Sequence, residues 1–244
     1  MRYDFDERDT RIVTTTKDEK TLFVGLDLGQ AKAFSAPAII ERGSTATTTD
    51  VRGEKPNCTN TKDEINSLHC IHLQRWQLRT SYPAIVADVV EMINGLDPER
   101  ITGGKTVLAI DATGVGAPVV DLFKREKINA ILAPIQIVAG ANVSNENGMT
   151  RVPKRDLVSV VQVALQNRTL KIASGLAEAE TLSRELQNFT VKITDAANDV
   201  YGAWRGGTHD DLVLAVALAV WKANQPIFRG LPVRESVSYY YEGW

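Results

Sequence analysis

The sequence is poor in cysteine. Its 244 residues include only Cys58 and Cys70, so there is no disulfide framework and a reducing compartment is the default expectation. Together with His69 and His72, these cysteines could in principle bind zinc. Their spacing matches no zinc-finger pattern, however, and the stretch around Cys70 alternates polar and apolar residues as a strand does. We therefore do not expect zinc here.

The chain also lacks a strong charge imbalance and a long apolar run. Its net charge is −2 and its pI is about 6.0, so a nucleic-acid partner would require a local basic patch or bound metal ions. No apolar stretch reaches membrane-spanning length without charge or proline, and we expect no membrane partner. Residues 1–20 lack both a signal peptide and apolar periodicity, which predicts a flexible lead-in.

Apolar residues are nevertheless abundant enough for a substantial core. Hydrophobic residues make up 43% and charged residues 24% of the chain, as in ordinary globular proteins. Apolar or alternating runs predict five strands, at residues 21–28, 36–41, 67–76, 106–110 and 130–138. Helical periodicity predicts helices within residues 82–96, 115–127, 153–166, 175–189 and 208–221.

The order of these elements indicates an α/β domain over residues 21–224. Its mixed five-stranded sheet should be antiparallel in the first strands, parallel later, and flanked by helices. A β-hairpin is predicted at residues 191–205, just before the last helix. Polar stretches at residues 42–66 and 139–150 read as a long excursion and a loop, and residues 225–244 as a C-terminal tail.

Residues 208–221 (THDDLVLAVALAVW) join an acidic head to an apolar run of good helix formers. Thr208 and His209 could cap the helix, and Asp210 and Asp211 suit its dipole. Because so apolar a helix packs on nearly all sides, its head should enter the interior or a cleft. The acids there are either a simple charge bias or part of a metal site.

Two further acids end predicted buried strands. Asp27 and Asp111 each precede a glycine turn, and sheets of this type place their sites at strand ends. Converging carboxylates repel by several kcal/mol in a partly dry site unless a cation neutralises them. Oxygen ligands favour Mg²⁺ or Mn²⁺, and two such ions about 3.5–4 Å apart would suit phosphodiester hydrolysis.

Each of these residues also has another interpretation. Asp27 could simply form a turn, and Asp111 could begin a phosphate loop, although its glycine spacing is too short for the dinucleotide fingerprint. His209 could cap the helix, orient an aspartate, or donate a proton to a leaving oxygen.

Five basic residues are candidates for contacting DNA. Arg151, Lys154 and Arg155 lie where a predicted helix begins. The positive end of the helix dipole repels positively charged side chains, so phosphate binding explains this placement better than a solvated helix start does. Lys192 and Arg205 lie beside aromatic residues on the predicted hairpin, which suits either a DNA-facing surface or a plain half-buried hairpin.

Five segments, in order along the chain, resemble the C-terminal nuclease domain of bacteriophage terminase large subunits. They are residues 27–30 (DLGQ), 80–86 (TSYPAIV), 110–116 (IDATGVG), 152–157 (VPKRDL) and 207–215 (GTHDDLVLA). The resemblance covers residues 21–224. Together, and in the order in which the family has them, the segments are specific evidence for this resemblance, although any one of them alone would be weak evidence.

The resemblance implies a ribonuclease H-like fold and two-metal endonucleolytic cleavage of double-stranded DNA, with little sequence specificity, during viral genome packaging. It places metal-binding acids at Asp27, Asp111 and Asp211, with Asp210 as an accessory or alternative ligand. One ion held by Asp27 and Asp211 would activate water, and another bridged by Asp27 and Asp111 would take up charge on the leaving oxygen.

The same resemblance implies partners outside the sequence. These are a packaging ATPase domain or subunit together with portal and small terminase components. It also implies a phage- or prophage-encoded protein in the cytoplasm of a bacterial host cell.

The sequence departs from the family in three respects. Complete terminases carry an ATPase motor, and we find no Walker A motif for one in this sequence. The nearest match, residues 99–106 (ERITGGKT), has Glu99 in place of the first glycine and precedes a strand instead of following one. An extra acidic or polar residue expected near Ala33 is missing, and residues 42–66 have no assigned role. An excised nuclease domain, a separate gene product and a relic all remain open.

Three other functions are considered. An actin-like or sugar-kinase-like ATPase also begins with a strand, an aspartate and a glycine turn, but usually needs two such domains. A Holliday-junction resolvase would differ in its preference for branched DNA. A non-catalytic binding module has no reason to keep mutually repelling carboxylates together.

Overall fold

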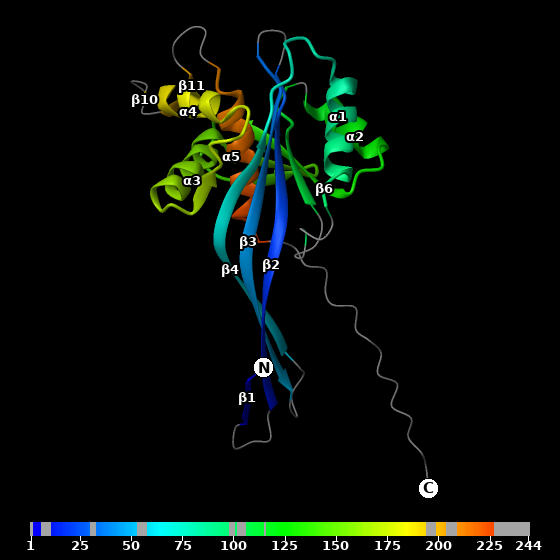
Figure 1. Ribbon diagram of the computed structural model, residues 1–244, viewed down its shortest axis with the longest axis vertical. Helices are drawn as coiled ribbons and strands as arrows, with labels where there is room; N and C mark the ends of the chain where they lie inside the picture. Colours follow the sequence, from blue (N-terminus) through cyan, green and yellow to red (C-terminus); the bar gives the residue numbers. More distant parts are fainter. Residues whose placement is uncertain are drawn as a thin grey trace.

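A mixed β-sheet forms the centre of the structure, and helices pack on both of its faces (Figure 1). The computed structural model describes residues 2–5, 11–29, 33–52, 58–97, 101, 106–114, 116–193, 199–203 and 209–226. Within these residues the sheet has nine strands, in the order β7-β8-β6-β5-β2-β3-β4-β9, with β1 paired to β2.

The elements have the following bounds. The sheet strands are β1 (Arg2–Phe5), β2 (Arg11–Asp27), β3 (Ala36–Arg52), β4 (Cys58–Leu73), β5 (Thr106–Asp111), β6 (Ala130–Val138), β7 (Ser144–Glu146), β8 (Met149–Pro153) and β9 (Leu170–Ile172). The helices are α1 (Tyr82–Asn94), α2 (Gly116–Arg125), α3 (Lys154–Gln166), α4 (Ala179–Asn188) and α5 (Asp211–Ala223). In the described part of the chain, no helix is both long enough and apolar enough to cross a membrane.

The predicted mixed sheet is confirmed, but the prediction of five strands is wrong. Strands β2, β3 and β4 are antiparallel, and β2, β5, β6 and β8 are successive parallel neighbours. Two of the extra strands, β7 and β8, begin within residues 139–150, which were predicted as a loop. There Asn147 and Gly148 adopt φ values of 50° and 76°, the left-handed conformations of a tight hairpin turn that lets short β7 pair with β8.

The predicted hairpin before the last helix is present. Strands β10 (Phe189–Ile193) and β11 (Asp199–Ala203) pair antiparallel as a separate two-stranded sheet. Lys192 lies on β10, but its side chain, like the whole of Arg205, falls outside the described residues. The predicted tail at 225–244 is described only as far as residue 226.

The flexible lead-in predicted for residues 1–20 and the irregular excursion predicted for residues 42–66 are both wrong where the structure describes them. Residues 11–20, 42–52 and 58–66 extend β2, β3 and β4 into a long arm that projects beyond the helices (Figure 1). Threonines face threonines across it, with Thr14 opposite Thr49 and Thr15 opposite Thr48. β-branched threonines favour strands without producing an apolar period, so periodicity alone missed the arm.

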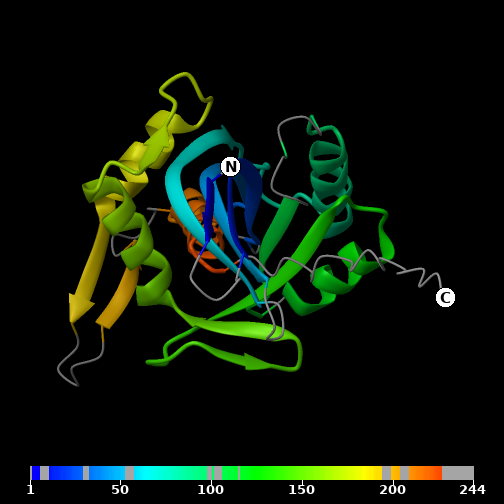
Figure 2. The same ribbon diagram turned by 90° about the horizontal axis from the view of Figure 1, so that it is seen from below.

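The two faces of the sheet bury separate cores. Alternate residues of β2 divide between them: Phe23 faces α3, α4 and α5, whereas Leu22 and Val24 face α1 and α2. Figure 2, seen from below, shows α5 enclosed between the long strands and the helices α3 and α4. This enclosure explains why nearly every residue of α5 is buried.

Gly25 allows α5 to approach the sheet closely. A Cβ atom at Gly25 would overlap the carbonyl oxygen of Ala215 and lie 2.8 Å from the nitrogen of Ala219. The small side chains of the helix and the absent side chain of the glycine therefore fix the position of α5 over β2.

Candidate functional site

Two of the predicted acids, Asp27 and Asp111, lie together at one end of the sheet. Asp27 is the last residue of β2 and Asp111 the last of β5, and the strands run parallel with Leu26 opposite Ile110. The two carboxyl groups are close enough for a hydrogen bond between them when one of them is protonated. Asp27 is buried, whereas Asp111 is partly exposed and accepts a hydrogen bond from the Thr113 N–H at 2.8 Å.

The other two acids lie at the start of α5. Asp210 is the N-cap residue and Asp211, which is buried, begins the helix. The cap role considered for His209 is therefore wrong, and Thr208 lies outside the described residues. The Asp210 side chain makes no capping hydrogen bond to the described first turn, because its carboxylate is turned toward Lys154 instead.

The four acids act on one another electrostatically. Burial raises the pKa of Asp27 well above its usual value, and the charges of Asp111, Asp211 and Asp210 raise it further, while Lys154 opposes the rise. Burial also raises the pKa of Asp111 and of Asp211. The structure thus brings the four carboxyl groups into one negative cluster, in which full ionisation is costly without a countercharge.

The countercharges in this arrangement come from the protein. Lys154 Nζ lies 3.0 Å from Asp210 Oδ2, and Arg75 lies 3.7 Å from Asp211 Oδ2. Across the described residues, no three His, Cys, Asp or Glu side chains already form a metal-ligand group. Asp211 Oδ2 is nevertheless buried and has no hydrogen-bond partner among those residues, so it is an acceptor in need of a donor or a cation.

His209 lies at the edge of this cluster. Its Nδ1 is 3.6 Å from Asp211 Oδ2, and its side chain is 33% exposed. The imidazole ring packs edge-on against the Phe34 ring, with 4.9 Å between centroids. His209 thus lies beside Asp211, with part of its ring accessible to solvent.

A buried acid that the sequence did not single out, Glu185 of α4, holds the first turn of α5. Its Oε2 accepts hydrogen bonds from the N–H groups of Leu212 at 3.0 Å and Val213 at 3.1 Å. Glu185 therefore caps the helix from a neighbouring element, and its charge suits the positive helix end. One clue was available: Glu185 follows Leu182 by three residues and so shares the buried face of the amphipathic α4.

Arg75, just after β4, is the second residue that sequence patterns did not identify. Its guanidinium forms an ion pair with Glu185 and also approaches Asp211. The same group stacks over the Phe34 ring, 4.9 Å from the centroid. No local pattern marks Arg75, because only the tertiary fold brings the end of β4 beside the head of α5.

Of the basic residues predicted to contact DNA, the structure brings Lys154 to the acids. Arg151 instead pairs with Glu146 at 2.8 Å, within the β7–β8 hairpin. Arg155 donates a hydrogen bond to the carbonyl oxygen of Ala141 at 2.7 Å. Lys154 is thus the member of this set that couples directly to the acid cluster.

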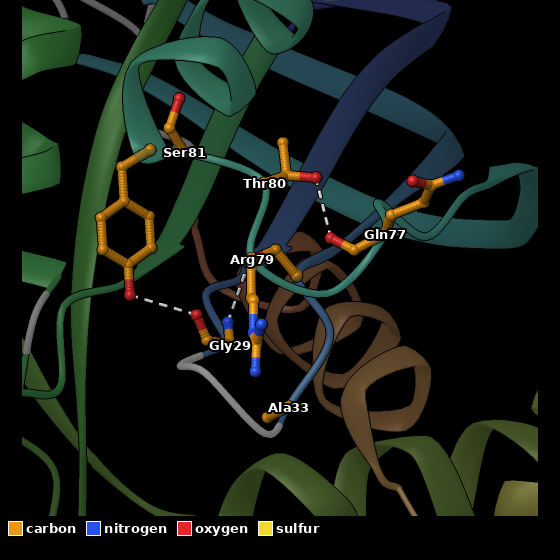
Figure 3. Close-up of a pocket in the computed structure, with 8 residues that line it drawn as sticks. Gly29, Ala33, Gln77, Arg79, Thr80 and Ser81 are labelled. Atoms are coloured by element: carbon orange, nitrogen blue, oxygen red, sulfur yellow. Dashed lines mark hydrogen bonds between the residues drawn. The ribbon is translucent and has the colours of Figure 1, made fainter.

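A cavity of about 240 Å³ lies beside the strand end that carries Asp27. It is lined in part by Gly29, Ala33, Arg79 and Tyr82, and Figure 3 shows the Arg79 side chain extending toward Gly29 and Ala33. The Tyr82 hydroxyl donates a hydrogen bond to the Gly29 carbonyl at 3.1 Å. This contact ties the start of α1 to the turn that follows Asp27.

Comparison with solved structures identifies the fold. The large terminase nuclease from thermophilic phage G20c, with bound magnesium, matches with a TM-score of 0.50 and 19% identity, over 89% of each chain. The large terminase nuclease domain of Thermus phage P74-26 matches with a TM-score of 0.49 and 18% identity, over 82% of this chain and 78% of that one. The manganese-soaked human cytomegalovirus terminase nuclease domain gives 0.47 and 14%, over 84% and 83%.

No protein-family model matches the sequence, and no curated protein gives a significant match. The likeness to the G20c nuclease is thus one of fold, at low identity. At that level it confirms the resemblance to terminase nuclease domains seen in the sequence.

Proposed function

We propose that this protein is a metal-dependent endonuclease that cleaves double-stranded DNA with little sequence specificity, as the nuclease part of a viral genome-packaging terminase. The observation that carries the proposal is the cluster of Asp27, Asp111, Asp210 and Asp211 where β2, β5 and α5 meet, in which burial and the charges of the other three acids raise the pKa of Asp27. The fold of a large terminase nuclease supports the same conclusion.

The chemistry of the cluster fits Mg²⁺ or Mn²⁺. Its donors are all carboxylate oxygens, which hard divalent cations prefer, and one of them, Asp211 Oδ2, is buried without a hydrogen bond to any described residue. The similar G20c nuclease is a magnesium-bound protein. We assign Asp27, Asp111 and Asp211 as ligands of two ions, with Asp210 beside them. When bound, such ions supply Lewis acidity for activating water and stabilising the leaving oxygen.

Other residues of the chain serve the substrate. Lys154, whose side chain is 27% exposed, neutralises Asp210 in this arrangement and can contact a DNA phosphate at the edge of the acids. His209 is close enough to Asp211 to orient it and exposed enough to hold a proton for the leaving oxygen. Arg151, Arg155, Lys192 and Arg205 complete the proposed phosphate-contacting set.

The proposed role in packaging requires further components. A packaging ATPase would move the DNA, and portal and small terminase components would complete the assembly in an infected bacterial cell. The nuclease reaction itself can be tested on the chain alone.

The test is incubation of supercoiled plasmid with the protein and Mn²⁺ or Mg²⁺, followed by electrophoresis. The wild type should produce nicked and linear DNA, and Asp111→Ala should produce neither. Asp121→Ala is the matched control, because Asp121 is an exposed aspartate on α2 that pairs with Lys124. The proposal fails if the wild type does not cut with either metal, or if Asp111→Ala cuts as well as Asp121→Ala.

A further inference from the structure

Buried charges from other elements fix the two ends of α5 separately. At its start, Glu185 accepts hydrogen bonds from Leu212 and Val213. At its end, Arg42 of β3 donates a hydrogen bond to the Ala223 carbonyl at 3.0 Å. Each charge has the sign that complements the helix dipole. The first contact lies at Leu212 and Val213 and the second at Ala223, so the two are roughly 16 Å apart along the helix, and one end can be perturbed without the other.

At the start of α5, Arg75 lies between two carboxylates. Its guanidinium is in direct contact with Glu185, whereas the nearest oxygen of Asp211 is 3.7 Å away. Stacking over the Phe34 ring restricts the plane of the guanidinium. Arg75 thus makes its closer contact with Glu185 and only a longer ion pair with Asp211, whose Oδ2 keeps no hydrogen bond to any described residue.

We propose that Glu185 and Arg75 are positioning residues for Asp211, a role that rests on the proposed metal-dependent activity. Glu185 fixes the first turn of α5 and retains the Arg75 guanidinium, so that a carboxylate oxygen of Asp211 stays available for a divalent cation. Without Glu185 as a partner, Arg75 would move from its present 3.7 Å separation to hydrogen-bond distance of Asp211 and compete with the cation for it.

The substitution E185Q separates the two tasks of Glu185. The amide oxygen can still accept hydrogen bonds from Leu212 and Val213, so the helix remains capped. The amide NH₂ group is a donor, however, and cannot pair with the guanidinium of Arg75. In E185Q, Arg75 should therefore turn to Asp211, and the added substitution R75Q should remove this competitor.

The experiment is calorimetric titration of each variant with MnCl₂, below the temperature at which thermal melts show any unfolding. We expect E185Q to weaken Mn²⁺ binding about tenfold, the scale on which residues behind metal ligands act. The double variant E185Q/R75Q should recover to within about threefold of the wild type, because the competing charge is gone. Plasmid nicking should follow the same order.

The control is Arg42→Met, which removes the hydrogen bond at the far end of the same helix. It should lower the melting temperature and leave Mn²⁺ binding unchanged. Unchanged binding in E185Q would overturn the proposal, as would equal weakening in E185Q and E185Q/R75Q, or a loss of binding in Arg42→Met as large as that in E185Q. If the wild type binds no Mn²⁺, the metal site itself is wrong and this proposal fails with it, whereas any of the former results overturns the positioning role alone.

Discussion

The substitution Asp27→Asn should stabilise the metal-free protein at neutral pH and abolish its response to metal. Burial and three neighbouring acids raise the pKa of Asp27, so the folded state retains a proton that the unfolded chain has released above pH about 4. The stability present at acidic pH is therefore lost as pH rises toward the folded-state pKa. The asparagine amide can donate a hydrogen bond to Asp111 and never ionises.

The size of this effect follows from proton linkage. One extra proton bound by the folded state makes the free energy of unfolding fall by up to about 1.4 kcal/mol per pH unit. Asp27→Asn should remove one such contribution, so the free energies of the two proteins should diverge between pH 5 and the folded-state pKa. The wild type should gain about 2.7 kcal/mol from metal at one hundred times its dissociation constant, and the variant almost nothing.

Urea denaturation in EDTA at pH values between 5 and 8, repeated with saturating Mn²⁺, measures both effects. Asp121→Asn, at an exposed position, is the matched control and should behave as the wild type. The reasoning is refuted if Asp27→Asn is no more stable than the wild type at pH 8 in EDTA, or if both gain equally from Mn²⁺. Either result would mean that Asp27 is not in the negative cluster.

Two further predictions concern residues around the site. Lys154→Met should lower the melting temperature in EDTA by about 2–4 °C, if its pairing with Asp210 contributes about 1 kcal/mol. The same variant should reduce the slope of log DNA affinity against log salt by about 0.9. Lys124→Met, at an exposed lysine on α2 outside the proposed phosphate-contacting set, should leave this slope unchanged. Gly25→Ala should cost about 1–3 kcal/mol in urea denaturation, because its methyl group would overlap the backbone of α5. Gly175→Ala, with nothing within 4 Å of the added methyl, should cost far less, and equal losses would show that α5 does not approach β2 as closely as described.

Apolar periodicity predicted the elements that carry the site. Strands β2 and β5 were expected to end at Asp27 and Asp111, as they do, since a strand buried on both faces is a short continuous apolar run. The α5 helix was expected to be buried on nearly all sides with an acidic head, and it is. These are local properties, which a single segment encodes by itself.

Pairing across the chain could not be predicted in the same way. The threonine-rich arm has no apolar face, and its strands form because residues 11–20 and 42–52 hydrogen-bond to each other. The turn at Asn147 and Gly148 has a recognisable sequence, but the strands around it are exposed and too short for periodicity to detect.

The sequence by itself determined that Asp27, Asp111, Asp210 and Asp211 stand at the ends of buried elements. An apolar run predicts burial, and the acid next to it lies in the same short segment, so no information from the rest of the chain is needed. The tertiary structure alone decided which charges meet them. Arg75 follows β4 and Lys154 begins α3, and both reach the acids only when those elements pack around α5. Glu185 of α4 meets Arg75 and the first turn of α5 in the same way. An ion pair depends on distance in space, and a short sequence segment does not contain both partners when they lie as far apart in the chain as Lys154 and Asp210, 56 positions.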